Sequence, residues 1–466
     1  MTRHYWVLFH RYTGLMMTLF LVIVALTGSV LAFKDELDTW LNPDLLCVEE
    51  RDAPMLDPLV LIGKAEESEP NMRVDEALLH VVPSRSFEVS LAPRFKNTAV
   101  KELVTLPVIL GAFNKEDGIV MIYLDPYTGK KIGERNITKG VSGRKDIIWF
   151  LYRLHMMLAL PASYAGLGAR ILGVVALVWT IDCFVGFYLT LPPRPRKQFL
   201  TLQTTKTQHE RCNRPSVLRI FWQRWKVAWK IKWPASFFRV NFDLHRAFGL
   251  WTWAMLFIFA WSSVLFNLDE VYYPVMNTLF GAPPPELPAP AMPTRVTPLE
   301  NPNLGWMEAR SRGRVLLDIK ANKDGFTIKY ETILLIDRDT GRYTMCADTL
   351  VRAEDAQACV EFDADTGKTP PEAPQATPEV KEAETRLSDT ISSWLSMLHM
   401  AKIFGLPMKI FVCVMGLVIT MLPVTGVYIW WKKRGAAKAK RHKITSRKLF
   451  PERIANENSA SDSQFL

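Results

Sequence analysis

The 466-residue sequence lacks several motifs that would assign a chemistry directly. Its six cysteines form no Cys-x-x-Cys pair, so a zinc or dithiol redox site of that kind is not expected. They also form no Cys-x-x-Cys-His, the motif for covalent haem attachment. No glycine-rich nucleotide fingerprint is present, so we do not expect this chain to bind NAD(P)H or flavin. An electron donor would therefore be a separate cytoplasmic protein or a membrane quinol.

Charged residues are missing from long stretches of the chain. Three runs of 22 residues carry none, and a fourth, Ile171–Leu191, carries only Asp182; the three are Tyr12–Phe33, Ala247–Leu268 and Ile410–Trp431. A helix of 22 residues is about 33 Å long, enough to cross a hydrocarbon core of about 30 Å. The first run is longer than the apolar core of a signal peptide, so we expect it to remain as an anchor. The sequence therefore predicts four transmembrane helices rather than the core of a soluble protein.

Charge asymmetry predicts the orientation of these helices. The segment from Leu191 to Asp243 contains twelve Lys and Arg but only two acidic residues, and the basic stretch "KKRGAAKAKRHK" follows Trp431. The segment Lys34–Gly143, by contrast, contains more acidic than basic residues. Because basic loops stay in the cytoplasm, both termini and the middle loop are expected inside. Tryptophans interleave with lysines in "QRWKVAWKIKW", which suits an amphipathic helix on anionic lipid. Each basic stretch adjoins a predicted span, so nucleic acid is not an expected partner.

The sequence contains an internal repeat. His10-Arg11 before the first run matches His245-Arg246 before the third, and "RLHMMLALP" matches "MLHMAKIFGLP" before the second and fourth. The loops share a further pattern, "IYLDPYTGK", "LLIDRDTGR" and "VEFDADTGK", in which an alternating strand leads into a glycine-containing turn. We therefore expect a four-helix bundle from a two-fold internal repeat, with two periplasmic α+β domains.

This organisation predicts eight segments. They are 1–33 (first span), 34–146 (first periplasmic domain), 147–191 (periplasmic half-helix and second span), 192–243 (basic cytoplasmic loop), 244–268 (third span), 269–395 (second periplasmic domain), 396–431 (fourth span) and 432–466 (basic cytoplasmic tail). Pro283–Pro298 carries seven prolines and predicts an extended linker, and 364–386 has the composition of a loosely held segment. Cys346 and Cys359 share the second outer loop, where an oxidising compartment permits a disulfide.

The repeated strand-Asp-x-x-Thr-Gly pattern resembles PepSY domains, and the paired spans, with "LFHRYTGL" and four placed histidines, resemble the PepSY-associated transmembrane family. The resemblance covers residues 3–435. Its members include iron-regulated inner-membrane proteins and ferric-siderophore reductases of the ferrioxamine type. The resemblance therefore implies a bacterial inner-membrane protein with two b-type haems within four helices.

The four repeated histidines also suggest haem by their own chemistry. Haem b needs two axial donors on opposite sides of its ring, and imidazole is a common donor in electron-transfer sites. About 30 Å of bilayer separates the two faces, so topology pairs His10 with His245 and His155 with His399. Two bis-histidine haems would then form an electron path across the membrane. A histidine at a membrane boundary can also simply hydrogen-bond to water or lipid, and that alternative stays open.

Other candidate residues surround these histidines. Arg11, Arg246 and Arg153 could pair with haem propionates, although basic residues also anchor span ends without any cofactor. Asp182, an acid within a span, could relay a proton, contact a quinol, orient the inner histidine or form a structural pair. Four methionines lie beside the outer histidines and are interpreted as packing residues rather than ligands: Met156, Met157, Met397 and Met400.

The leading hypothesis is a transmembrane ferric-chelate reductase that passes electrons to a periplasmic acceptor, for which the resemblance implies a ferric siderophore. The first alternative is a cofactor-free, membrane-anchored PepSY module that binds or regulates another molecule. A solute permease is the second alternative, and the scarcity of charge within the spans argues against it. A b-type absorption spectrum distinguishes the first hypothesis from both others.

Overall fold

The computed structural model describes residues 3–94, 119–138, 140–161, 164–193, 217–281, 295, 297–350, 357–369 and 387–449. The chain forms two compact units, here called the membrane unit (Met1–Ala32, Arg170–Tyr273 and Ile391–Leu466) and the sheet unit (Phe33–Ala169 and Pro274–Thr390). Most of the predicted linker Pro283–Pro298 and of the predicted loose segment 364–386 lies outside the described residues. The same holds for 194–216 of the basic loop and for the tail beyond 449.

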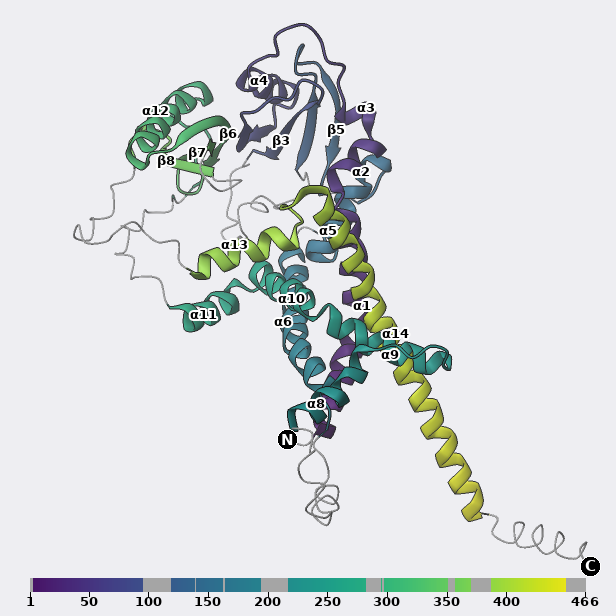
Figure 1. The fold of residues 1–466 in the computed structure, drawn as a ribbon. Coiled ribbons are helices and arrows are strands. Elements are labelled where there is room, and N and C mark those ends of the chain that lie inside the picture. The colour runs from purple at the N-terminus through teal and green to yellow at the C-terminus, as the bar shows by residue number, and fades with distance from the viewer. Residues whose placement is uncertain are drawn as a thin grey trace, which may run out of the picture. The chain divides into compact units, whose positions relative to one another are not determined.

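Three helices are long and apolar enough to cross a membrane: α1 (Arg3–Leu31), α6 (Ala165–Thr190) and α14 (Gly405–Leu449), the last over Gly405–Ala439. A fourth candidate is the pair α9 (Phe237–Trp251) and α10 (Trp253–Asn267), which is bent by 69° (Figure 1). The expectation of one continuous helix over the third span is therefore corrected. At the bend the Thr252 hydroxyl donates to the Phe248 carbonyl at 2.8 Å, a side-chain bond that often bends helices.

Small residues bring the membrane helices close together. Helix α1 packs against α14, where the Ser29 hydroxyl donates to the Cys413 carbonyl at 3.0 Å. A Cβ at Gly416 of α14 would lie 2.6 Å from the Ala25 carbonyl oxygen and would also strike Ser29. Such close backbone approach is the usual way in which helices associate in a bilayer.

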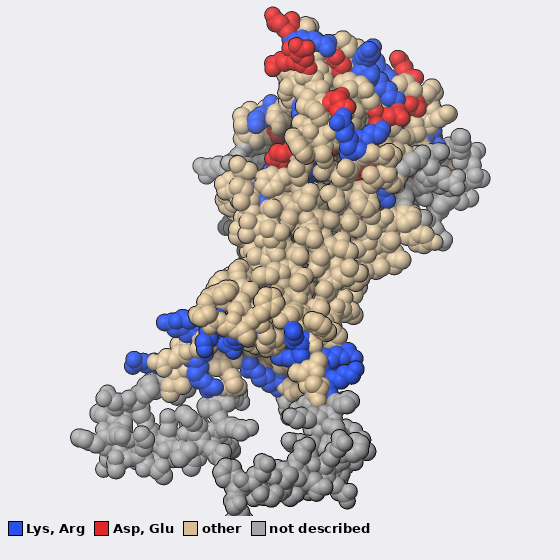
Figure 2. Space-filling model, turned by 90° about the vertical axis from the view of Figure 1, so that its right-hand side faces the viewer, with Lys and Arg blue, Asp and Glu red and all other residues tan. Residues whose placement is uncertain are grey.

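The membrane unit has one basic end. Figure 2 shows a group of Lys and Arg side chains at one end of this unit, with no Asp or Glu side chain visible among them. Basic residues are frequent in α8 (Val217–Trp225), the 3₁₀ turn η5 (Lys226–Trp229) and the later part of α14.

Two antiparallel four-stranded sheets form the centre of the sheet unit. The first has the order β1-β3-β4-β5 and the second β2-β6-β7-β8. The strands are β1 (Met72–Val74), β2 (Glu76–Leu78), β3 (Phe87–Pro93), β4 (Val120–Leu124), β5 (Lys131–Asn136), β6 (Thr327–Asp337), β7 (Arg342–Leu350) and β8 (Gln357–Asp363). The remaining helical elements within the described residues are α2 (Lys34–Leu41), α3 (Pro43–Leu46), α4 (Pro58–Ser68), η2 (Arg144–Asp146), α5 (Ile147–Met157), α11 (Asp269–Phe280), α12 (Trp306–Asp324) and α13 (Leu387–His399).

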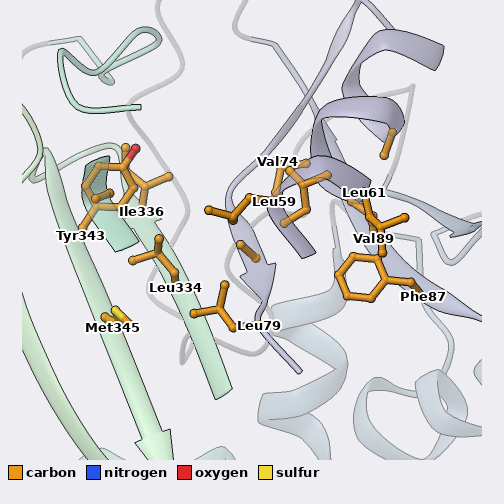
Figure 3. Packing of buried hydrophobic residues seen from close by; sticks show 14 of the residues in the cluster. Leu59, Leu61, Val74, Leu79, Phe87, Val89, Leu334, Ile336, Tyr343 and Met345 are labelled. Carbon is orange, nitrogen blue, oxygen red and sulfur yellow. The ribbon is translucent and has the colours of Figure 1, made fainter. Parts of the chain in front are cut away.

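The two loops that the sequence assigned to separate domains share a sheet and a core. Strand β2 of the first loop pairs with β6 of the second, from Glu76 opposite Leu335 to Leu78 opposite Ile333. Figure 3 shows Leu334, Ile336, Tyr343 and Met345 of the second loop facing apolar side chains of the first. A fully buried large apolar side chain contributes about 1.5–3 kcal/mol, so each loop depends on the other for much of its core.

The repeated Asp-x-x-Thr-Gly pattern makes the same turn three times. In each copy one oxygen of the aspartate side chain accepts from the N–H groups two and three residues later, at 2.7–3.2 Å. The glycine has a φ of 67–71°, a conformation that costs a residue with a side chain about 1–2 kcal/mol. The predicted strand-to-turn signal is therefore confirmed, and the three copies are Asp125–Gly129, Asp337–Gly341 and Asp363–Gly367.

A buried ion pair joins α2 to the first sheet. Both terminal nitrogens of Arg135 donate to the two carboxylate oxygens of Asp38, at 2.8 and 3.0 Å, and the arginine side chain has no exposed surface. The guanidinium lies over the Tyr123 ring, and the Tyr123 hydroxyl donates to Glu88. Burial raises the pKa of Glu88, although Tyr123 and nearby cations oppose the shift. Cys346 and Cys359 form a disulfide across β7 and β8, which settles a pairing that the sequence left open.

Candidate functional site

His10 is held by an acid on another helix. It lies on α1, and its Nδ1 is 2.9 Å from each carboxylate oxygen of Asp182 on α6. The Thr13 hydroxyl, one turn along α1, lies 3.3 Å from the same carboxylate. Asp182 is almost buried, with 9% of its side chain exposed, so the contact is shielded from water. Because the carboxylate accepts, Nδ1 of His10 carries the proton and donates it.

His245 is held in the same way by a different acceptor. It lies on α9, and its Nδ1 is 2.9 Å from the Leu422 carbonyl oxygen and 3.1 Å from the Thr425 hydroxyl, both on α14. A carbonyl can only accept, so Nδ1 of His245 must also be the protonated nitrogen. The electron pair of each ring is thereby left on Nε2, the form in which a neutral imidazole binds a metal.

The two histidine environments are related by the internal repeat. Asp182 and Gly186 on α6 correspond to Leu422 and Gly426 on α14, an offset of 240 in both cases. A Cβ at Gly186 would lie 3.5 Å from Cε1 of His10, and one at Gly426 would lie 3.4 Å from Cε1 of His245. Each imidazole therefore packs on a glycine one turn after its hydrogen-bond partner. Helices α1, α6, α9 and α14 all contribute to this arrangement.

The separation of the two rings fits a shared metal ion. The centroids of His10 and His245 are 6.0 Å apart, with the ring planes inclined at 64°. Two imidazole nitrogens that share one metal ion, each at about 2 Å from it, have ring centroids roughly 6 Å apart. The spacing of His10 and His245 is therefore compatible with a shared metal ion. Within the described residues there is no cluster of three or more His, Cys, Asp or Glu side chains that could hold a metal ion. A haem held by two histidines does not need such a cluster.

The structure shows what Asp182 contacts. Of the roles left open by the sequence, its bond to His10 matches the orientation of the inner histidine, and its contact with Thr13 adds a hydroxyl partner. Proton relay and quinol contact stay hypotheses. The corresponding position in the other repeat is Leu422, which offers only its backbone carbonyl. His10 therefore has an acidic hydrogen-bond partner, whereas the partner of His245 is a neutral carbonyl.

The outer histidines lie at the ends of short helices. His155 is in the last turn of α5, which ends with Leu158 and Ala159 at positive φ, and His399 is the last residue of α13. Nδ1 of His399 is 2.6 Å from the Ser262 hydroxyl, which itself donates to the Ile258 carbonyl. His155 belongs to the sheet unit and His399 to the membrane unit, so their pairing stays a prediction.

Two of the three candidate arginines have structural partners. Arg246 donates to the carbonyls of Val227, Ala228 and Lys230 and to Asp243, which fastens α9 to η5.

Arg153 is buried and donates to the carbonyls of Thr138 and Leu160. These bonds give both arginines structural partners, and their predicted contacts with propionates stay a prediction. Arg11, on α1 beside His10, stays a candidate for that role.

The PepSY-associated TM region matches residues 7–433, which include both histidine pairs and both loops. The chain belongs to this family. A comparison with curated proteins gave no match. Family membership therefore identifies a membrane protein with a PepSY-associated transmembrane region, as the resemblance of the sequence implied.

Sequence reasoning missed Thr13, Thr425 and Ser262, the hydroxyl groups around the histidines. It also assigned neither Gly186 nor Gly426 to a histidine. The internal repeat does contain a signal for the two glycines, because "VGFYL" at 185–189 aligns with "TGVYI" at 425–429. That alignment places Gly186 on Gly426 and, one turn earlier, Asp182 on Leu422. Only the structure shows that these positions face His10 and His245.

Proposed function

We propose that this protein carries electrons across the bacterial inner membrane through two bis-histidine b-type haems and reduces a ferric chelate, such as a ferric siderophore, on the periplasmic side. One observation carries the proposal: His10 and His245, from different repeats, lie 6.0 Å apart with both Nδ1 atoms already bonded. The proposal also includes four spans related by the two-fold repeat.

Charge and redox chemistry support the orientation. Basic side chains gather at one end of the membrane unit (Figure 2), and α8 and η5 are rich in Lys and Arg, as expected for segments at a cytoplasmic face. The disulfide between Cys346 and Cys359 lies in the sheet unit, as expected for an oxidising compartment. We therefore place the sheet unit in the periplasm and both termini in the cytoplasm.

The residues divide the chemistry between them. Bound haem would supply one-electron transfer between ferric and ferrous states. His10 and His245 would hold the inner haem, and His155 and His399 would hold the outer one. An acceptor chelate fits this chemistry because hard oxygen ligands hold ferric iron better than ferrous iron, so reduction releases the metal.

The direct test is the absorption spectrum of the purified full-length protein, expressed with haem in excess. We expect a b-type spectrum and about two haems per chain. His10→Ala and His245→Ala should each remove one haem, and the double variant should lose no more than either single variant. His155→Ala and His399→Ala should remove the other. Dithionite-reduced protein should then be reoxidised by a ferric hydroxamate chelate.

His80→Ala is the matched control. His80 lies in the sheet unit, stacked on Tyr330 with centroids 4.5 Å apart, and it has no partner in the repeat. This variant should keep both haems. A colourless protein under full haem supply would overturn the proposal and favour a membrane-anchored binding module. Loss of the same haem in all four ligand variants would overturn the pairing while leaving haem binding intact.

A further inference from the structure

The segment that joins the second and third spans has a cationic, aromatic face. In α8 and η5, Arg219, Trp222, Gln223 and Lys226 are spaced at i, i+3, i+4 and i+7, which places them on one side of a helix. Together with Trp229 they line a groove of about 420 Å³. That volume lies within the range of about 300–1,000 Å³ typical of small-molecule sites. The groove is formed entirely within the membrane unit.

The opposite face fixes this segment in place. Trp225 and Ala228 are buried together with Leu250 of α9, and the Trp225 indole donates to the Thr190 hydroxyl at the end of α6. Carbonyls of η5 also accept from the guanidinium of Arg246 on α9. The groove therefore rests on a packed base, which lowers the entropic cost of binding a ligand.

The exposed face carries large apolar side chains that water disfavours. Trp222 is 57% exposed, Trp233 67% and Phe237 71%, and all follow the end of α6, a helix apolar enough to span a membrane. Tryptophan is enriched at the headgroup level of a bilayer, where its ring sits in the interface. The groove is thus placed to meet lipid headgroups.

The charge around the groove selects an anion. Residues 217–242 contain no Asp or Glu, while Arg219, Arg224, Lys226, Lys230 and Lys232 all lie within them. Arginine matches the oxygens of a phosphate in a forked geometry, and lysine supplies a point charge. We propose that the groove lined by Arg219, Trp222, Gln223, Lys226 and Trp229 binds the headgroup phosphate of an anionic phospholipid from the basic-side leaflet. This site does not depend on haem binding.

The test compares lipid binding by full-length protein in a zwitterionic detergent, measured by native mass spectrometry with added phosphatidylglycerol or phosphatidylcholine. We expect each groove cation that contacts the phosphate to contribute about fivefold in affinity, the size of the effect of one cation at an anionic lipid surface. A zwitterionic micelle presents no extended anionic surface, so cations outside the groove should contribute little. The Arg219→Gln/Lys226→Gln variant should therefore bind phosphatidylglycerol about 25-fold more weakly than the parent protein. Phosphatidylcholine should bind weakly to both. A single Lys226→Gln variant, with about a fivefold loss, guards against misfolding of the double variant.

The matched control is Lys230→Gln/Lys232→Gln, which removes the same charge from exposed positions outside the groove. Binding within twofold of the parent is expected. Equal losses in both double variants would show diffuse attraction to a basic surface and overturn the proposal. Equally tight binding of phosphatidylcholine would overturn it as well. Displacement of the lipid by millimolar inorganic phosphate would assign the groove to a soluble phosphate compound and reject the membrane source.

Discussion

Asp182 offers the sharpest test of the site formed by His10 and His245, because the corresponding position in the other repeat has no carboxylate. Asp182→Leu gives α6 the residue that α14 carries at the corresponding position 422. In the parent protein both carboxylate oxygens of Asp182 lie 2.9 Å from Nδ1 of His10. The substitution removes both oxygens and puts an apolar side chain of similar size in their place. Asp182→Asn keeps the shape and one acceptor oxygen but removes the charge.

The geometry sets the size of the effect. A hydrogen bond to a charged group contributes about 1.5–3 kcal/mol, and only 9% of the Asp182 side chain is exposed, so water screens it little. Loss of such a partner from a metal-binding histidine costs about 10–100-fold in metal affinity, or about 1.4–2.7 kcal/mol. We expect that range for Asp182→Leu. Asp182→Asn retains a neutral hydrogen bond and should lose about fivefold.

The assay isolates the inner site. In a His155→Ala background only the inner haem should bind, so its affinity follows from titrating apo-protein with haem and reading the absorption spectrum. The midpoint potential of the same sample is the second readout. A carboxylate partner makes an imidazole a stronger donor, which favours the ferric state. The potential should therefore rise in Asp182→Leu.

Thr180→Val is the control for this experiment. Its hydroxyl is buried on α6, and its hydrogen bond goes to the Ala176 carbonyl rather than to a histidine. This variant should match the parent in haem affinity and potential. If Asp182→Leu also matched the parent while His10→Ala lost the haem, the carboxylate would have no role in holding His10. If Asp182→Leu and Thr180→Val lost haem equally, general disruption of α6 would explain both.

Three further predictions concern stability, measured by unfolding of the full-length protein in detergent. Gly416→Ala should destabilise by about 1–3 kcal/mol because the new methyl group overpacks a close helix contact, whereas Gly14→Ala, with nothing within 4 Å, should not; equal effects would contradict the packing argument. Asp38→Asn strands the buried guanidinium of Arg135 and should cost about 3–5 kcal/mol; a loss below about 1 kcal/mol would contradict that burial. Burial raises the pKa of Glu88 above its ordinary 4.5, so the folded state favours the protonated acid and loses stability as pH rises through the raised pKa. Glu88→Gln should remove this loss of stability at higher pH. If the variant and the parent protein showed the same dependence of unfolding free energy on pH, the prediction would be wrong.

Features that depend on neighbouring residues were readable from the sequence. The apolar runs predicted helices of membrane length, because span length follows from bilayer thickness and residue rise. The Asp-x-x-Thr-Gly pattern predicted its turn, because the aspartate bonds lie within three residues and the glycine follows at once. The repeat also predicted that His10 and His245 meet, since equivalent positions in two halves lie at the same depth.

Other features depend on contacts between distant residues, which no local pattern encodes. Strand β2 reads as part of the first loop, yet it completes the sheet of the second because its pairing partner lies more than 250 residues away. Two of the candidate arginines, Arg246 and Arg153, proved to bond backbone carbonyls supplied by other segments. The bend at Thr252 interrupts a run whose composition predicts a straight helix.

The sequence by itself determined that this chain spans a membrane and where its basic residues gather, and it predicted that His10 and His245 lie close together. These properties follow from local hydropathy, charge and repetition. The tertiary structure decided which nitrogen of each inner histidine is left for a metal. That choice depends on an acceptor from another helix, Asp182 for His10 and the Leu422 carbonyl for His245. Helix packing alone brings those acceptors within hydrogen-bonding distance.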